Sequence, residues 1–187
     1  MVSRRRESGE MTYVSLLRGV NVGGNKMVAM ADLRSLLTRL GFADVTSVLQ
    51  SGNVVFGGPP RSGPRLERLL ETEMEQHLGL KADVHVRTAD EWRAVVKGNP
   101  FRDEASRDPS HLLVTFFKEP LLEANVKALR TAITGPETLH AKGRHLYMVF
   151  PAGIGNSKAG VMIDKTLGAR GTARNWNTVL KLAALTG

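Results

Sequence analysis

The sequence contains no cysteine, which excludes disulfide bonds and any chemistry that depends on a thiolate. It has no run of about eighteen apolar residues, so it predicts no membrane-spanning helix. Residues 1–10 are charged and lack the apolar stretch of a secretory signal. Because neither export nor oxidative pairing is indicated, we expect a soluble protein of the cytoplasm that has no membrane as a partner.

Recognisable catalytic motifs are absent as well. The sequence has no G-x-S-x-G elbow and no Ser-His-Asp set, and it leaves open whether the protein is an enzyme. Aromatic residues make up 5% of the chain, and no predicted strand carries the RNP pattern with which RRM sheets stack bases. Any contact with nucleic acid is therefore expected to be electrostatic.

The chain carries a formal net charge of +8, from 26 lysines and arginines against 18 aspartates and glutamates. Such a balance attracts nucleic acids, phosphorylated metabolites and acidic surfaces. Arginines scattered over a solvated surface give the same excess, so charge alone identifies no partner. Residues 4–6 are all arginine and lie in a tail over residues 1–10 that we expect to be disordered, and Met11 is an alternative translation start to Met1.

Residues 11–88 predict the order strand, helix, strand, strand, helix, strand. Ser51 and Gly52 are expected to form a two-residue hairpin turn, and Pro64 to begin the second helix. The strands are predicted over residues 12–18, 45–50, 53–56 and 82–87. Apolar residues recur at helical spacing in the two helices, at Met30, Leu33, Leu36, Leu37 and Leu40 and at Leu66, Leu69, Leu70, Met74 and Leu78.

Residues 109–187 repeat this order and add a C-terminal helix. Strands are predicted over residues 111–117, 138–141 and 144–150, with Lys142 and Gly143 as the second turn. Whether residues 169–172 form the last strand is left open. Helices are predicted from Pro120, with Leu122, Val126, Leu129 and Ile133 on one face, over residues 157–167, and near the C-terminus with Trp176, Val179, Leu180 and Ala183 inward. Residues 89–108 join the units as a helix capped by Thr88 and a loop from Gly98.

This organisation predicts an α+β fold of two tandem ferredoxin-like (βαββαβ) units, each with an antiparallel sheet and two helices on one face. A hydrophobic content of 42% is sufficient for real cores. We expect the first core at Leu33, Leu37, Val54, Phe56 and Leu70, and the second at Phe116, Leu129, Leu146 and Met148.

Five short motifs occur in order along the chain: LLRGVNVGGNK at residues 16–26, LGF at 40–42, QSGNVVF at 50–56, NPF at 99–101 and TARNWNT at 172–178. Together they resemble a bacterial family known as domain of unknown function 1697 (DUF1697). The resemblance covers nearly the whole chain beyond Met11. It implies tandem ferredoxin-like domains and implies no activity, because the family has none assigned.

Two glycine-rich loops, over residues 19–26 and 153–158, each lead from a strand towards a helix. Such loops can turn backbone N–H groups towards an anion. Neither matches G-x-G-x-x-G or a P-loop, and the structural alternative is that the glycines supply positive φ angles.

Amides and cations gather at the ends of several predicted elements. Arg174, Asn177, Thr178 and Lys181 have the spacing of one helix face, which favours either a phosphate-binding face or an ordinary solvated one. The amides of the first loop and hairpin fit either a polar pocket or a network that locks two loops. The candidate ligand-binding residues are Arg18, Asn21, Asn25, Lys26, Ser51, Asn53, Lys158, Arg174, Asn175 and Asn177.

His140 and His145 form a weak candidate metal pair. With Lys142 and Gly143 as the turn they lie directly opposite, with Cβ atoms roughly 4.5–5.5 Å apart. No third ligand is identified, since the reach of His111 is left open, and two histidines alone make a poor zinc site. We predict no metal and no cofactor.

The leading hypothesis is a binding module for an anionic ligand, either nucleic acid or a phosphorylated metabolite. One alternative is an enzyme acting on a small phosphorylated or carboxylated substrate between the two units. The other is a structural protein that forms a homodimer through exposed sheet edges.

Overall fold

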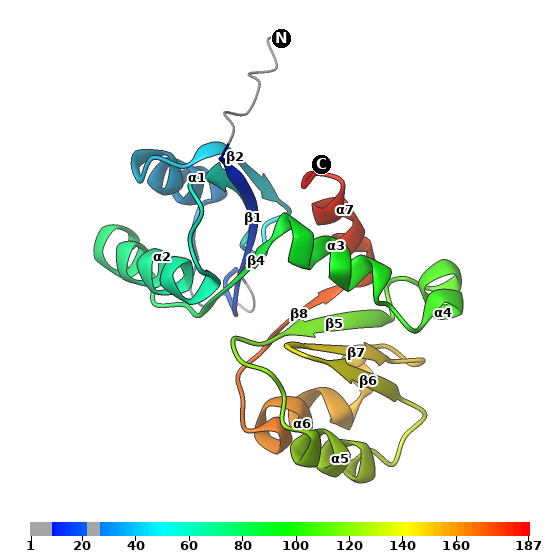
Figure 1. The fold of residues 1–187 in the computed structure, drawn as a ribbon. Helices are drawn as coiled ribbons and strands as arrows, with labels where there is room; N and C mark the ends of the chain where they lie inside the picture. Colours follow the sequence, from blue (N-terminus) through cyan, green and yellow to red (C-terminus); the bar gives the residue numbers. More distant parts are fainter. Residues whose placement is uncertain (1–8, 22–26) are drawn as a thin grey trace. The chain divides into compact units, whose positions relative to one another are not determined.

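The chain forms an α+β structure with two four-stranded antiparallel sheets, as a computed structural model that describes residues 9–21 and 27–187 shows (Figure 1). It divides into two units. One comprises the described residues up to Arg93 together with Leu182–Gly187, and the other comprises Ala94–Lys181. Among the described residues, no helix combines the length and apolarity needed to cross a bilayer.

The first unit has two helices against one face of its sheet, whose strand order is β2-β3-β1-β4. All strand pairs in it are antiparallel. The five residues predicted for its core all belong to one buried cluster, which confirms that prediction. The elements are β1 (Met11–Leu17), α1 (Met30–Arg39), β2 (Ala43–Val48), β3 (Asn53–Gly58), α2 (Gly63–Leu78) and β4 (Val84–Thr88).

Two carboxylates of α2 bind the outer edge of β4. Oε1 of Glu67 accepts a hydrogen bond of 2.9 Å from the backbone N–H of Val86, and Oε1 of Glu71 accepts one of 2.8 Å from that of Val84. The outer edge of an edge strand is otherwise a row of unpaired backbone groups. Helix α2 therefore covers part of this edge as well as the sheet face.

The second unit has the strand order β6-β7-β5-β8, with α5 and α6 packed on one face of the sheet. Its elements are α4 (Arg102–Arg107), β5 (Leu112–Phe116), α5 (Glu123–Ala132), β6 (Thr138–Lys142), β7 (His145–Val149), the short helix η1 (Ile154–Asn156), α6 (Lys158–Leu167) and β8 (Thr172–Asn175). The helices α3 (Ala89–Lys97) and α7 (Trp176–Ala183) each contain a boundary between units.

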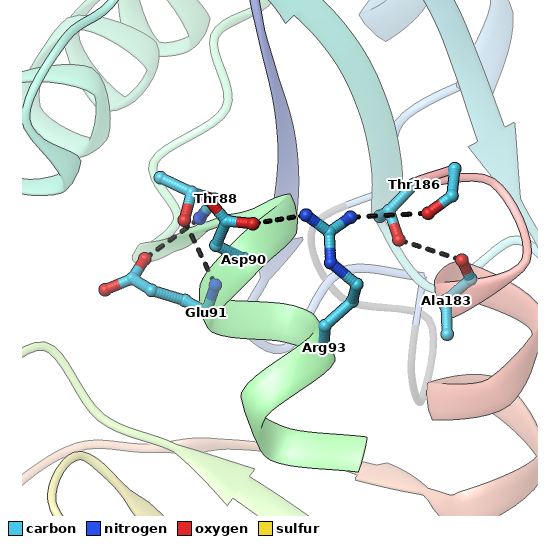
Figure 2. Close-up of polar contacts among 7 residues, drawn as sticks. Thr88, Asp90, Glu91, Arg93, Ala183 and Thr186 are labelled. Carbon is cyan, nitrogen blue, oxygen red and sulfur yellow. Dashed lines mark hydrogen bonds and ion pairs between the residues drawn. The ribbon is translucent and has the colours of Figure 1, made fainter. Parts of the chain in front are cut away.

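Thr88 caps α3, as the sequence predicts. The N–H of Glu91 donates to Oγ1 of Thr88, and the N–H of Thr88 donates to the Glu91 carboxylate, which together make a capping box (Figure 2). Two residues after Glu91, Arg93 lies between the carboxylate of Asp90 and the C-terminal segment (Figure 2). Its guanidinium donates to the Gly187 carbonyl oxygen at 3.3 Å.

Both predicted hairpin turns are wrong by a small shift. In the first hairpin Val48 pairs with Asn53, so the turn spans residues 49–52. The side-chain amide of Asn53 also donates to the Val48 carbonyl oxygen across this turn. In the second hairpin Lys142 pairs with His145, and Gly143 is the first turn residue. The first residue of a primed turn has a positive φ, and Gly143 has a φ of 57°. Lysine adopts a positive φ less readily than glycine, which explains why Lys142 is not the first turn residue.

Leu122, predicted to share a helix face with Val126, and Phe116, predicted for the second core, both differ from their predictions. Leu122 is 68% exposed because it precedes α5 as its N-cap. Phe116 is fully buried, but β5 alternates, and its neighbours Leu113 and Phe117 point to the α5–α6 side instead. The other three residues predicted for the second core, Leu129, Leu146 and Met148, are in that core.

The segment after Gly98 and the C-terminal elements also differ from the sequence prediction. Residues 102–107 form α4 where a loop is predicted, and the last strand lies at Thr172–Asn175 instead of residues 169–172. Helix α7 therefore starts at Trp176, and it buries Leu182 and leaves Leu180 43% exposed.

Candidate functional site

Asn21 is a structural lock between two loops of the first unit. Its Nδ2 donates to the carbonyl oxygens of Val28 at 2.9 Å and of Gln50 at 2.7 Å, and its Oδ1 accepts from the Val28 N–H at 2.8 Å. Its φ of 53° is one that asparagine tolerates better than most residues. The side chain is thus engaged with backbone, which agrees with the locking alternative.

The other described candidates of the first unit also have structural contacts. Asn53 is fully buried, and its Nδ2 donates to Val48 O and to Ser51 Oγ, each at 2.9 Å. Arg18 is half-buried, and its backbone N–H donates to the Asp83 carbonyl oxygen. Asn25 and Lys26 lie outside the described residues.

The candidates near the C-terminus lie at the junction of β8 and α7. Arg174 is in the strand, so the predicted helix face with Asn177 and Lys181 does not exist. Nη1 of Arg174 donates to Thr172 Oγ1 at 2.7 Å, and burial lowers the pKa of this guanidinium to about 10, so it stays charged at neutral pH. Asn175 caps α7 by accepting from the Thr178 N–H at 3.0 Å, and Asn177 is exposed.

Lys158 begins α6 beside a pocket of about 310 Å³. Ser157 caps this helix by accepting from the Ala159 N–H at 3.1 Å, and its hydroxyl also donates to the Glu137 carboxylate. The Glu137 carboxylate therefore contacts the residue that caps α6. Ser157 of the second glycine-rich loop thus has a capping role.

The candidate histidine pair does not have the predicted geometry. His140 pairs with Tyr147, and His145 pairs with Lys142, so the two rings are diagonal neighbours on one face. His145 packs edge-on against the Phe116 ring with centroids 5.4 Å apart. Within residues 9–21 and 27–187, no group of three metal-ligating side chains is close enough to hold an ion.

A pocket of about 360 Å³ in the second unit contains the most complete set of chemical groups that we find in the described chain. We call it the His111 pocket. Arg107 and His111 are its basic groups, and Glu104 and Asp108 are its acidic groups. The rest of its lining carries no charge and consists of Pro136, Thr138, Val149 and Pro151.

Asp108 holds the imidazole of His111 in place. Oδ2 of Asp108 lies 2.8 Å from Nδ1 of His111, and Ser110 Oγ donates to the other carboxylate oxygen. The hydrogen bond from Ser110, followed by the charge interaction with His111, lowers the pKa of Asp108 below its ordinary value. The carboxylate is therefore ionised at neutral pH.

The backbone around His111 fixes where its ring lies. Its N–H donates to the Asp108 carbonyl oxygen at 3.1 Å, which closes the turn that carries both side chains. Its carbonyl oxygen accepts from the Phe150 N–H at 2.9 Å. Across from the ring, a Cβ atom on Gly153 would lie 3.5 Å from Nε2 of His111, and Gly153 has a φ of 80° that favours glycine.

The sequence pattern suggests His111 only as a third metal ligand and does not predict this pocket. The available signal is the segment Asp108-Pro109-Ser110-His111, in which aspartate, serine and proline favour a turn. A turn of this kind brings the first and fourth side chains together. Nothing in the sequence pattern, however, places α4 and β6 beside that turn.

The comparisons with known proteins agree with the family that the motifs suggest. A family model described as "Protein of unknown function (DUF1697)" matches residues 11–147, so the chain belongs to this family. A solved structure of the conserved bacterial protein SP0830 from Streptococcus pneumoniae is similar to it at 27% identity and a TM-score of 0.71. The match covers 96% of this chain and 100% of that one. No match is found among curated proteins.

Proposed function

We propose that the protein binds a small anionic ligand, a phosphorylated or carboxylated compound, in the His111 pocket of its second unit. The observation that carries the proposal is that Arg107 and His111 line the same pocket. A guanidinium offers several N–H donors in a planar fork that fits phosphate or carboxylate. The volume of about 360 Å³ suits a small ligand better than a nucleic acid strand.

The acidic residues of the pocket lie against its basic ones. The carboxylate of Glu104 lies 3.9 Å from Nη2 of Arg107, and Asp108 holds His111. Arg107 itself is largely exposed, with 76% of its side chain accessible, so its guanidinium is open to a ligand from solvent. The ion pair with Glu104 is worth little at such exposure and is readily exchanged for a bound anion.

The test is calorimetric titration of the full-length protein with inorganic phosphate, citrate and a short oligonucleotide at two salt concentrations. Arg107→Gln should weaken phosphate or citrate binding roughly tenfold or more, since a hydrogen bond to a charged group contributes about 1.5–3 kcal/mol. Arg102→Gln is the matched control, because Arg102 is exposed on the same helix and does not line the pocket.

Equal affinity of both variants for these anions, or no binding below millimolar concentration in low salt, would contradict the proposal. Oligonucleotide binding that falls steeply with salt and is insensitive to Arg107→Gln would point to nucleic acid on another surface.

We further propose that each unit is ferredoxin-like and that the protein works in the cytoplasm. Both units repeat the order β-α-β-β-α-β, and their strand orders, β2-β3-β1-β4 and β6-β7-β5-β8, are equivalent. Superposition of experimental coordinates of the two units on ferredoxin-like domains tests the fold, and fractionation of cells tests the location.

A further inference from the structure

We infer that the His111 pocket is a site of proton transfer, in which Nε2 of His111 acts as a general base towards a hydroxyl group of the bound anion. This inference rests on the proposed function, because it names the chemical class of the ligand: a hydroxyl-bearing phosphorylated or carboxylated compound. It goes further in assigning an activity to one atom. Four features of the structure support it.

The first feature is the tautomer of the ring. Because Nδ1 of His111 lies 2.8 Å from an ionised carboxylate oxygen of Asp108, the neutral imidazole keeps its proton on Nδ1. The lone pair of the neutral ring is therefore on Nε2. A histidine whose Nδ1–H is held by a carboxylate is oriented to accept a proton at the other nitrogen.

The second feature is the state of Asp108. Its carboxylate receives a hydrogen bond from the Ser110 hydroxyl, as well as the contact with the ring. These interactions keep it ionised, so it can stabilise the imidazolium that forms when Nε2 takes up a proton. Asp108 is in this sense a positioning residue, since it acts through His111.

The third feature is the path to Nε2. The backbone of Gly153 lies near Nε2, since a Cβ atom there would come within 3.5 Å of it. The other charged groups that line the pocket are Glu104, Arg107 and Asp108, while the lining residues from β6, β7 and the adjoining loops are uncharged. With 37% of its side chain exposed, His111 is reached from the pocket.

The fourth feature is the neighbouring cation. Arg107, one turn before His111 in the chain, can hold the phosphate or carboxylate of a ligand whose hydroxyl then lies against the ring. In the step that we infer, the O–H bond of the ligand breaks, its electron pair stays on the oxygen, and the proton binds Nε2. Asp108 balances the charge of the resulting imidazolium.

The experiment combines a spectroscopic and a chemical reading on the full-length protein. Long-range ¹H–¹⁵N correlation spectra of the imidazole report which nitrogen carries the proton, and diethyl pyrocarbonate reports the nucleophilicity of the free nitrogen. The variants are Asp108→Asn and, as a matched control, Glu104→Gln, which changes a second carboxylate of the same pocket without touching the ring nitrogen contact. His140, which is exposed, serves as the internal reference for reagent reactivity.

We expect wild-type His111 to be in the Nδ1–H form, to react faster than His140, and to be protected by saturating phosphate. Asp108→Asn should mix the tautomers and slow the reaction of His111 roughly tenfold, and Glu104→Gln should leave the tautomer unchanged. An Nε2–H tautomer in the wild type, or equal reactivity of His111 in wild type and Asp108→Asn, overturns the inference. If the reactivity of His111 depends on Asp108 but neither phosphate nor citrate binds, the proposed function is overturned. The role of Asp108 in positioning His111 would then still hold.

Discussion

Glu67 accepts a 2.9 Å hydrogen bond from the backbone N–H of Val86 while only 2% exposed, and this makes a buried acid on α2 part of the sheet. The same relationship recurs between Glu71 and Val84. Four helical residues advance about 6 Å and two strand residues about 6.6 Å, so an i, i+4 pair on a helix matches alternate amides of an antiparallel strand. The apolar stripe predicted for α2 has a 3.6-residue period, which gives no sign of this match.

Glu67→Ala should destabilise the protein by about 1–3 kcal/mol, because it leaves the Val86 amide buried without an acceptor. Glu67→Gln retains a carbonyl oxygen and should lose less. Glu75→Ala, at an exposed position of the same helix, should stay within about 0.5 kcal/mol of wild type in urea unfolding. Indistinguishable midpoints for Glu67→Ala and Glu75→Ala would show that the contact does not contribute.

A second prediction uses two leucines of α7. Leu182 is fully buried, whereas Leu180, which the periodicity predicts to face inward, is 43% exposed. Leu182→Ala should cost about 2–5 kcal/mol of stability, and Leu180→Ala much less. The measurement is thermal or urea unfolding of the two variants. A larger loss of stability for Leu180→Ala than for Leu182→Ala would show that Leu180 faces inward, as the sequence predicts.

A third prediction concerns Asn21 and follows from its three backbone hydrogen bonds. Asn21→Ala removes all three hydrogen bonds and puts alanine, which tolerates a positive φ less well than asparagine, at this position. The free energy of unfolding should fall by about 1–3 kcal/mol. Asn21→Gly relieves the backbone strain and should recover part of the loss. Asn177→Ala, at an exposed position, is the control. If both alanine variants unfold at the same urea concentration, Asn21 is not a lock.

A fourth prediction concerns Tyr147, whose hydroxyl donates a 2.8 Å hydrogen bond to the Val95 carbonyl oxygen. Burial raises its pKa from 10.0 to about 12. Because the folded state holds the proton more tightly than the unfolded state, this contribution to stability is complete below pH 10 and is lost as pH rises to 12.

The measurement is urea unfolding of wild type and Tyr147→Phe between pH 9 and pH 12. At pH 9 the variant should be less stable, since a buried carbonyl loses its donor. The difference should shrink towards pH 12, and the subtraction cancels other groups that titrate in this range. A difference that does not change with pH would contradict the assigned shift.

Much of the first unit follows from local pattern. Met30, Leu33, Leu36 and Leu37 repeat at helical spacing, and each is buried. Gly79 directly follows α2, and it adopts the left-handed conformation at the C-cap, where glycine is preferred. These features depend on neighbours within a few residues, and such information is present in a short window of sequence.

The register of strand pairing and the direction in which a side chain points are harder to predict from the sequence. The position of Gly143 within its turn decides whether His140 faces His145 or Tyr147, and a shift of one residue is enough to change the answer. Leu122 has the correct spacing for the α5 face but precedes the first turn. Arg174 belongs to a strand only because β5 offers a free edge to residues 172–175, which is a long-range condition.

The site prediction shows the same division. The amides that stand out in the sequence, at Asn21, Asn53 and Asn175, are engaged with turns and a helix cap of their own. The His111 pocket depends on α4, β6 and β7 lying around one turn. No window of sequence contains that assembly, although the turn of Asp108 and His111 is itself local.

The grouping of Leu182–Gly187 with the first unit has a consequence for synthesis of the chain. The second unit, Ala94–Lys181, is one continuous segment nested between the two parts of the first. A ribosome therefore finishes the second unit before it supplies the last residues of the first. Domains generally fold in the order in which they emerge. Here the unit that begins first is the one completed last.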